Sequence, residues 1–268
     1  MYKEFAPYSL DRLTDEADYA VIGPTDSRTR VHNTQRVPHS AICHLERDFG
    51  DGRLSGCTAF FISPTRLLTA GHCMLSHVRR LAGVRSQPVR VRITPGRASV
   101  NAKPFGSQWV RRWRIHPVYL RRPSSQHDIA VLELDRPFPG NPGHFQIYSP
   151  STAALRAMRG SQMLHISGYP GDKPKGEQWE HAERLDRVTA SQLFYSVDTC
   201  PGHSGAPVWL APQGNQPARV IAVHTAGPQR HANGAWGCAP GAPVAPAGSF
   251  NRGVRLDSAL AERILSGL

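Results

Sequence analysis

The chain has 268 residues and is basic, because 32 lysine and arginine residues against 20 acidic ones give a formal net charge of +12. Hydrophobic residues make up 40% of the chain and charged residues only 19%, which excludes a coiled coil and a charge-driven disordered chain. With 24 glycines and 23 prolines, long helices cannot dominate, and no apolar run reaches the roughly 18 residues that span a membrane.

The amino-terminal end differs in charge from the rest. Residues 1–20 contain five acidic residues against two basic ones, a local net charge of −3 that leaves +15 for the remaining chain. They lack the basic start and apolar run of a secretory signal. We interpret them as an acidic leader or pro-segment held partly by charge, with a disordered terminus as the plain alternative.

Short strands dominate residues 21–135, which we take as a first lobe. In residues 89–93, valine and isoleucine alternate with arginine, a pattern typical of a half-exposed strand. Residues 136–150 are rich in proline and glycine, which indicates a linker between two lobes. The strands expected in this lobe are 58–62, 67–70, 89–93 and 129–134.

Residues 151–256 repeat the pattern of short strands and form a second lobe, with a loop rich in glycine, proline and alanine between residues 226 and 251. Residues 257–268 read as a helix that Asp257 or Ser258 caps and Gly267 ends. Many short strands in two lobes with a terminal helix predict an all-β pair of barrels. The strands expected here are 163–167, 193–197, 207–210 and 219–224.

The five cysteines favour disulfides over a metal site. No CxxC pair occurs, and adjacent His–Cys pairs are poor ligand sets because neighbouring residues on a strand point to opposite faces. We expect two disulfides, one spare thiol, an oxidising compartment and neither metal nor cofactor. The arginines are spread along the chain, and no RNP, zinc-finger or helix-turn-helix signature accompanies them. We therefore expect no specific nucleic-acid partner.

Three segments carry candidate chemistry: TAGHC at 69–73, HDIAVLEL at 127–134 and DTCPGHSGAPVW at 198–209. A serine is inert at neutral pH without an adjacent base, and His72 is placed to take the proton of Ser204 while Asp128 holds the imidazole. Taken singly, they fit a packed histidine, a solvated aspartate and a plain turn serine. Their occurrence together, in the order His, Asp, Ser at strand edges, favours catalysis.

These segments resemble the chymotrypsin-like serine endopeptidases, and the bacterial glutamyl endopeptidase branch in particular. Four further segments carry that second resemblance: VIGPTDSRTRV at 21–31, SGYPGDKPKGEQWEH at 167–181, AVHTAG at 222–227 and NRGVRL at 251–256. The resemblance implies two six-stranded antiparallel β-barrels with a cleft between them, in addition to the carboxy-terminal helix.

The resemblance also implies roles for single residues. His72, Asp128 and Ser204 fall on the catalytic triad, and Gly202 with Ser204 falls on the oxyanion hole. Thr199, His224 and the freed amino terminus of Val21 fall on the pocket for the substrate's P1 carboxylate. Cys57 with Cys73, and Cys200 with Cys238, fall on two disulfides of the family, which leaves Cys43 as a buried spare thiol.

Two residues depart from the wider family. His203 stands before the nucleophile where most animal relatives have the aspartate that pairs with a new amino terminus, so that switch is absent. Asp198 stands where trypsin-like enzymes keep the acid that binds arginine or lysine, so specificity for Arg or Lys remains the alternative to specificity for Glu.

The resemblance thus implies a serine endopeptidase that works through an acyl-enzyme on Ser204 and cleaves after Glu, less readily after Asp. We expect it to act on proteins or peptides as a monomer, in a secreted or periplasmic location, after cleavage between Ala20 and Val21. A non-catalytic binding protein on the same fold is the second class, although no triad residue is missing.

Overall fold

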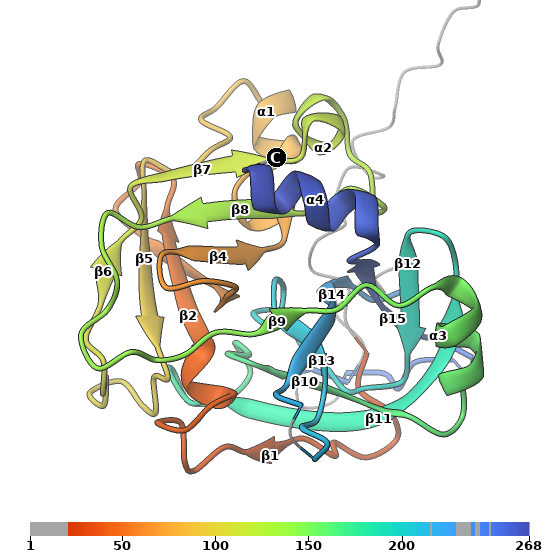
Figure 1. The fold of residues 1–268 in the computed structure, drawn as a ribbon. Helices are drawn as coiled ribbons and strands as arrows, with labels where there is room; N and C mark the ends of the chain where they lie inside the picture. The colour runs from red at the N-terminus through yellow and green to blue at the C-terminus, as the bar shows by residue number, and fades with distance from the viewer. Residues whose placement is uncertain (1–20, 215, 229–236, 239–241, 247, 268) are drawn as a thin grey trace, which may run out of the picture.

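Two β-sheets make up the two lobes in the computed structural model of the chain (Figure 1). The structure describes residues 21–267 except 215, 229–236, 239–241 and 247, so the predicted acidic leader at residues 1–20 lies outside the described residues. The α-helices of the described part are α1 (His77–Leu81), α2 (Pro117–Arg121), α3 (Thr152–Met158) and α4 (Ser258–Ser266). No helix in this part is long and apolar enough to cross a membrane.

The first lobe is a curled antiparallel sheet of seven strands in the order β6-β5-β2-β3-β4-β8-β7. Its inner face is apolar: Val91 and Ile93 of β5 are buried while Arg90 and Arg92 point outward, as the alternation in the sequence predicts. The strands are β2 (Ile42–Asp48), β3 (Leu54–Phe61), β4 (Arg66–Thr69), β5 (Arg90–Pro95), β6 (Gln108–Trp109), β7 (Arg112–Ile115) and β8 (Ala130–Glu133).

The second lobe is a closed barrel. Six strands run in the order β11-β10-β13-β14-β15-β12, and the pairing of β11 with β12 closes the ring. Two short strands join its outside, because β1 pairs with β11 and β9 pairs with β14. The strands are β1 (Thr29–Arg30), β9 (Gln146–Ile147), β10 (Met163–Gly168), β11 (Trp179–Val188), β12 (Gln192–Tyr195), β13 (Pro207–Leu210), β14 (Arg219–Ala226) and β15 (Asn251–Arg255).

This architecture confirms the predicted all-β, chymotrypsin-like class with a carboxy-terminal helix, and corrects one detail of it. The second lobe is the expected six-stranded barrel, whereas the first lobe is a seven-stranded sheet whose edge strands are β6 and β7 rather than a closed six-stranded barrel. The two-residue strand β6 is short, which limits how far that edge extends.

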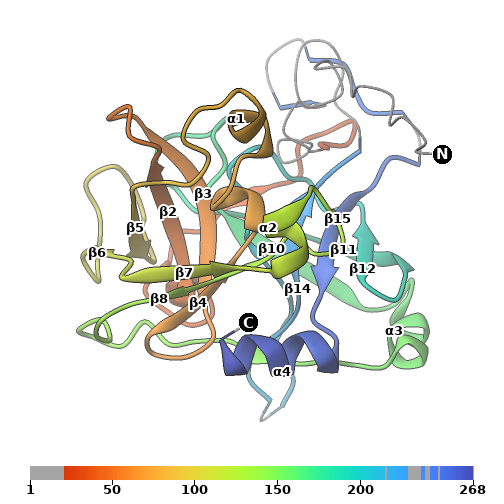
Figure 2. The same cartoon turned by 90° about the horizontal axis from the view of Figure 1, so that it is seen from above.

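Each end of the described chain lies against the lobe that is distant in sequence. At the start, β1 pairs with β11 of the barrel. At the end, Asp257 caps α4 by accepting from the Leu260 N–H at 2.9 Å, and Gly267 ends the helix with a φ of +97°. The last turn of α4 lies beside the strands of the first lobe (Figure 2). Arg66 of β4 and Arg114 of β7 hold it there by donating to the carbonyls of Leu265 and Gly267.

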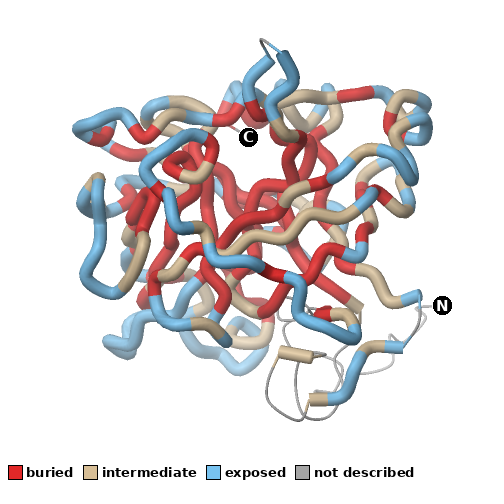
Figure 3. The backbone as a smooth tube through the Cα atoms, turned by 90° about the horizontal axis from the view of Figure 1, so that it is seen from below, coloured by how far each residue is buried: buried red, intermediate tan, exposed pale blue. Residues whose placement is uncertain are grey.

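The lobes meet at a buried seam. In Figure 3 the buried backbone gathers in the centre of the molecule and the exposed backbone in the outer loops. Thr58 of β3 donates its N–H to the Ser204 carbonyl at 2.9 Å and its hydroxyl to the Gly202 carbonyl at 2.8 Å. The strand of one lobe therefore holds directly the loop that carries the candidate nucleophile of the other.

Candidate active site

His72 lies in a 3-10 turn, Gly71–Cys73, directly after β4. Its backbone N–H donates to Asp128 Oδ1 at 2.7 Å, and its ring Nδ1 lies 2.7 Å from Asp128 Oδ2, so one carboxylate fixes both the main chain and the ring. Both side chains are buried. Gly71 makes this approach possible, because a Cβ there would lie 3.0 Å from Asp128 Oδ1 and 2.9 Å from the Tyr119 ring.

The second ring nitrogen of His72 is left open. Nε2 is buried and has no hydrogen-bond partner among the described residues. A buried polar atom without a partner costs free energy, and in native proteins such atoms often mark functional sites. With Nδ1 held against Asp128, a neutral imidazole carries its proton on Nδ1 and offers Nε2 as an acceptor.

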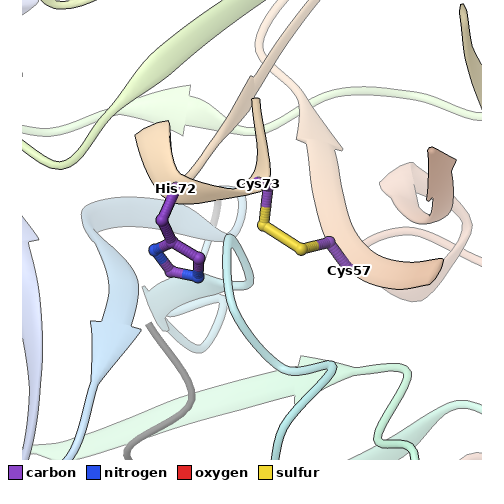
Figure 4. A group of neighbouring side chains, drawn as sticks. All are labelled: Cys57, His72 and Cys73. Atoms are coloured by element: carbon purple, nitrogen blue, oxygen red, sulfur yellow. A yellow bond between two sulfur atoms is a disulfide. The ribbon is translucent and has the colours of Figure 1, made fainter. Parts of the chain in front are cut away.

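A disulfide fixes the turn that carries His72. Cys57 of β3 and Cys73 are joined at an S–S distance of 2.05 Å, and Figure 4 shows the bridge beside the imidazole. The potential ligand atoms of Cys57, His72 and Cys73 form the one group within 4.8 Å that the described residues offer a metal ion. Because the two sulfurs are bonded to each other in the disulfide, neither can act as a thiolate ligand, and the group does not fit a metal ion.

Ser204 lies in a glycine-rich turn before β13, packed against the histidine segment. Its carbonyl oxygen is 3.5 Å from Cys73 Sγ. Gly205 has a φ of +87°, and a Cβ there would lie 2.2 Å from both the Thr58 carbonyl oxygen and Thr69 Oγ1. Gly202 has a φ of +103°, and a Cβ there would lie 2.4 Å from the Tyr169 carbonyl oxygen. Only glycine fits these two positions.

The Cys200–Cys238 disulfide is also present, with an S–S distance of 2.12 Å, and Cys43 is the buried free thiol. Both predicted bridges are thus confirmed. His203, the residue before the nucleophile, is buried, and its Nδ1 accepts from the Cys200 N–H at 3.1 Å. Burial lowers the pKa of His203 to about 3, so the ring is neutral and offers no charge to an amino terminus.

His224 of β14 is buried behind the serine turn. Its Nδ1 lies 2.8 Å from the hydroxyl of Tyr195 on β12. Burial holds the pKa of His224 well below its usual range and raises that of Tyr195, so a neutral imidazole meets a protonated phenol. A phenol that donates to Nδ1 leaves the imidazole proton on Nε2.

Thr199 and Val21 lie together in the same lobe. The Thr199 N–H donates to the Val21 carbonyl at 3.0 Å, and Thr199 Oγ1 is buried without a hydrogen-bond partner among the described residues. Asn251 of β15 holds Val21 from the other side, accepting from its N–H at 3.1 Å and donating to its carbonyl at 3.0 Å. Asn251 pairs in register with Tyr195, which links this group to His224.

Asp198 is turned toward the amino-terminal segment. Its two carboxylate oxygens accept from the backbone N–H groups of Gly23 and Ser27, each at 2.8 Å. The side chain is buried, and its Oδ2 also lies 3.6 Å from His181 Nδ1. Both oxygens are therefore occupied by groups of the chain itself.

Sequence reasoning missed two anchors of this segment, Asn251 and Arg28. The guanidinium of Arg28 is buried and forms ion pairs with Asp26 at 2.8 Å and Asp172 at 2.5 Å. Asn251 opens the NRGVRL segment and Arg28 lies in VIGPTDSRTRV, so both stood within segments singled out in the sequence. An arginine is rarely buried without partners, yet its burial cannot be read from the sequence.

Comparisons with known proteins agree with this geometry. The trypsin-like peptidase domain family matches residues 57–223. Over 255 residues the chain is 32% identical to a glutamyl endopeptidase of Bacillus licheniformis, a match that covers 94% of this chain and 67% of that protein. It is 26% identical over 209 residues to an extracellular metalloprotease of Bacillus subtilis, covering 78% and 63%. The chain thus spans about two thirds of the length of these curated relatives.

A solved structure of a Glu endopeptidase in complex with MPD has the same architecture. It aligns with a TM-score of 0.71 and 28% sequence identity, and the alignment covers 92% of this chain and 98% of that one. With this likeness, 32% identity across 94% of its length and the family match over residues 57–223, the chain belongs to the trypsin-like peptidases and is a serine endopeptidase.

Proposed function

We propose that this peptidase works through an acyl-enzyme on Ser204 and cleaves after Glu, less readily after Asp. The observation that carries the proposal is the state of His72. One ring nitrogen is held by Asp128, while the other is buried, unpartnered and ready to accept a proton.

The reaction proceeds in two halves. Ser204 Oγ attacks the carbonyl carbon and gives its proton to His72 Nε2, while Asp128 stabilises the imidazolium that forms. The oxyanion is held by the N–H groups of Gly202 and Ser204. His72 then protonates the leaving amine, the C–N bond breaks, and water attacks the acyl-enzyme with the same histidine acting as base.

The preference for Glu is supported by two donors in the barrel. A carboxylate that leaves water must be met by hydrogen-bond donors, or its burial is uncompensated. With the Tyr195 hydroxyl donating to Nδ1, His224 keeps its proton on Nε2, and Thr199 Oγ1 lacks a partner among the described residues. Both groups can donate a hydrogen bond to a carboxylate, and neither supplies the negative charge that would pair with an arginine or lysine.

The third element is Val21. Its carbonyl accepts from the Thr199 N–H and its nitrogen donates to Asn251 Oδ1, and cleavage between Ala20 and Val21 would turn this nitrogen into a cationic amine. We propose that removal of the leader completes the pocket in this way. The alternative pocket acid, Asp198, is less suited to bind a substrate because Gly23 and Ser27 already occupy both its oxygens.

We further propose that the enzyme acts on proteins or peptides as a monomer outside the cytoplasm. Two disulfides support this location, because such bonds persist in oxidising compartments.

The nucleophile is tested by Ser204→Ala, with Ser161→Ala at an exposed serine as the matched control. We expect Ser204→Ala to lose nearly all turnover while remaining folded, and the double variant with His72→Ala to lose no more than either single variant. A sulfonylating serine reagent should label Ser204 alone. Turnover near the wild-type rate in Ser204→Ala would refute the assignment.

The P1 preference is tested on a peptide library in which only the P1 residue varies. We expect Glu first and Asp second, and a chain that retains Ala20 before Val21 should cleave both poorly. Cleavage mainly after Arg or Lys would overturn the Glu proposal but not the nucleophile. Binding of peptides without any turnover would identify a non-catalytic protein instead.

A further inference from the structure

A cavity of about 410 Å³ opens beside the serine turn. Both lobes line it, which places it on the seam where the two candidate catalytic segments meet. None of the groups proposed to bind the P1 carboxylate is among its lining residues. Its lining includes Glu46 and Arg47 of β2, Ser55 and Gly56 of β3, and Lys173 and Lys175 between β10 and β11.

The cavity lies on the side where the leaving segment of a substrate departs; this step rests on the proposed function. His72 must sit beside the nitrogen that it protonates, so the residues after the scissile bond run out past His72 and the Cys57–Cys73 bridge. Gly56 precedes that bridge in the sequence, and Arg47 Nη1 donates to the His72 carbonyl at 2.8 Å. The P1 side chain points the other way, toward His224.

Positive charge dominates the cavity. The Glu46 carboxylate is buried, and three cations meet it: Arg92 at 2.7 Å, Arg97 at 3.4 Å and Lys175 at 3.5 Å. Arg47 adds a further positive charge at the wall, held by Ser55 Oγ at 3.0 Å and by the His72 carbonyl. The single negative charge of Glu46 is therefore smaller than the positive charge of the cations around it.

Lys175 is the cation best placed to move to a substrate. Its ammonium lies 3.5 Å from Glu46 Oε1, which has no hydrogen-bond partner among the described residues, and 59% of its side-chain surface is exposed. Lys173, the other lysine of the cavity, is already paired with Asp26 at 2.7 Å and lies over the Trp179 ring. Lys175 thus has both the freedom and the charge to meet an incoming group.

We propose that this cavity binds the substrate residues after the scissile bond and that Lys175 selects an acidic side chain at one of the first two positions, P1′ or P2′. The negative charge of such a side chain offsets the positive charge that Glu46 alone does not neutralise. A basic side chain that donates to Glu46 Oε1 is the opposite outcome, and it would have to approach past Arg47, Lys173 and Lys175.

The test uses peptides with one fixed P1 residue, in which P1′ or P2′ is Asp, Asn, Ala or Lys. At one of the two positions we expect Asp to exceed its neutral isostere Asn by about fivefold in kcat/KM, a ratio that salt reduces. Lys175→Met should abolish this ratio and Lys175→Glu should reverse it, whereas Lys103→Met at an exposed lysine should keep it. Equal rates for Asp and Asn at both positions, or a preference for Lys, overturns the proposal.

Acyl transfer separates this inference from the proposed function. Dipeptide amides added during turnover compete with water for the acyl-enzyme, so the transfer yield reports binding on the leaving side alone. We expect a higher transfer yield with dipeptide amides that contain Asp than with those that contain Asn, and only where Lys175 is present. If acyl transfer occurs without this difference, the cavity assignment is wrong and the acyl-enzyme stands. If no acyl-enzyme forms on Ser204, the proposed function itself is wrong.

Discussion

Replacing Asp198 by alanine separates two roles for one carboxylate. As an anchor, it holds the amino-terminal segment through the N–H groups of Gly23 and Ser27, and the variant should lose stability and the order of Val21. As the acid of a trypsin-like pocket, it would receive a basic substrate side chain, and the variant should lose only the turnover of Arg and Lys substrates. The structure favours the anchor.

The expected magnitude follows from the two hydrogen bonds, each 2.8 Å long. A hydrogen bond to a charged group contributes about 1.5–3 kcal/mol. Ser27 is exposed and Gly23 is half-buried, so water replaces part of what is lost. We therefore expect the free energy of unfolding to fall by about 2 kcal/mol, nearer the value of one bond than of two.

The effect on activity follows from the contact between Val21 and Thr199, which the loosened segment no longer holds in place. We expect kcat/KM for a Glu substrate to fall about tenfold, equivalent to about 1.4 kcal/mol. Urea denaturation and paired substrates with Glu or Arg at P1 measure the two effects, and Asp51→Ala in an exposed loop is the control. Unchanged stability with loss of Arg cleavage alone would refute the anchor.

The histidine-loop disulfide, the half-buried Glu180 and the tyrosine behind His224 each give a further prediction. Changing Cys57 and Cys73 to serine frees a loop with a sequence separation of 16 and should lower the free energy of unfolding by about 3 kcal/mol in urea denaturation. Burial opposes ionisation of Glu180, but hydrogen bonds from two histidines and a serine outweigh it and lower the pKa of this carboxyl from 4.5 to about 2. Its stabilisation, about 3 kcal/mol, is complete above pH 4.5 and lost toward pH 2, so the stability difference from Glu180→Gln in urea should shrink over that range. Tyr195→Phe removes a hydrogen bond of about 1 kcal/mol to His224 and should lower kcat/KM for Glu substrates about fivefold in steady-state assays.

Each of these three predictions has a contradicting result. Equal stability before and after loss of the disulfide would mean that the loop is already ordered in the unfolded chain. A Glu180→Gln difference that is constant with pH would mean that the pKa of this carboxyl is the same in the folded and the unfolded chain. An equal fall for every P1 residue in Tyr195→Phe would mean that the tyrosine supports the fold and not the acid pocket.

Local patterns and long-range contacts were predictable from the sequence to different degrees. The arginine–valine alternation located β5, and the GHC and GHSG segments located the turns of His72 and Ser204, because each pattern lies within a few residues. Asp172, one partner of Arg28, and Val21, one partner of Asn251, each lie more than a hundred residues away in the sequence, and no local pattern reports these contacts. Their roles emerge only when the lobes are packed.

Asp198 is a single residue whose role the sequence alone does not determine. Its position six before the nucleophile is compatible with a pocket acid and with an anchor, and the two roles use the same residue type. Only the direction of the carboxylate, toward Gly23 and Ser27, separates them. The first lobe is a similar case, because a sheet closes into a barrel only if its two edge strands pair. That pairing is a long-range contact which the pattern within each strand does not report.

The crossed ends of the chain have a consequence for how the molecule loses its structure. The amino-terminal strand β1 pairs with β11 on the outside of the barrel, and α4 at the other end is held by Arg66 and Arg114 of the first lobe. A gene fragment that encodes only one lobe would therefore lack the terminal element, β1 or α4, that packs against that lobe. On heating, the two lobes should come apart in one cooperative transition, and the loss of peptidase activity should follow that single transition rather than precede it.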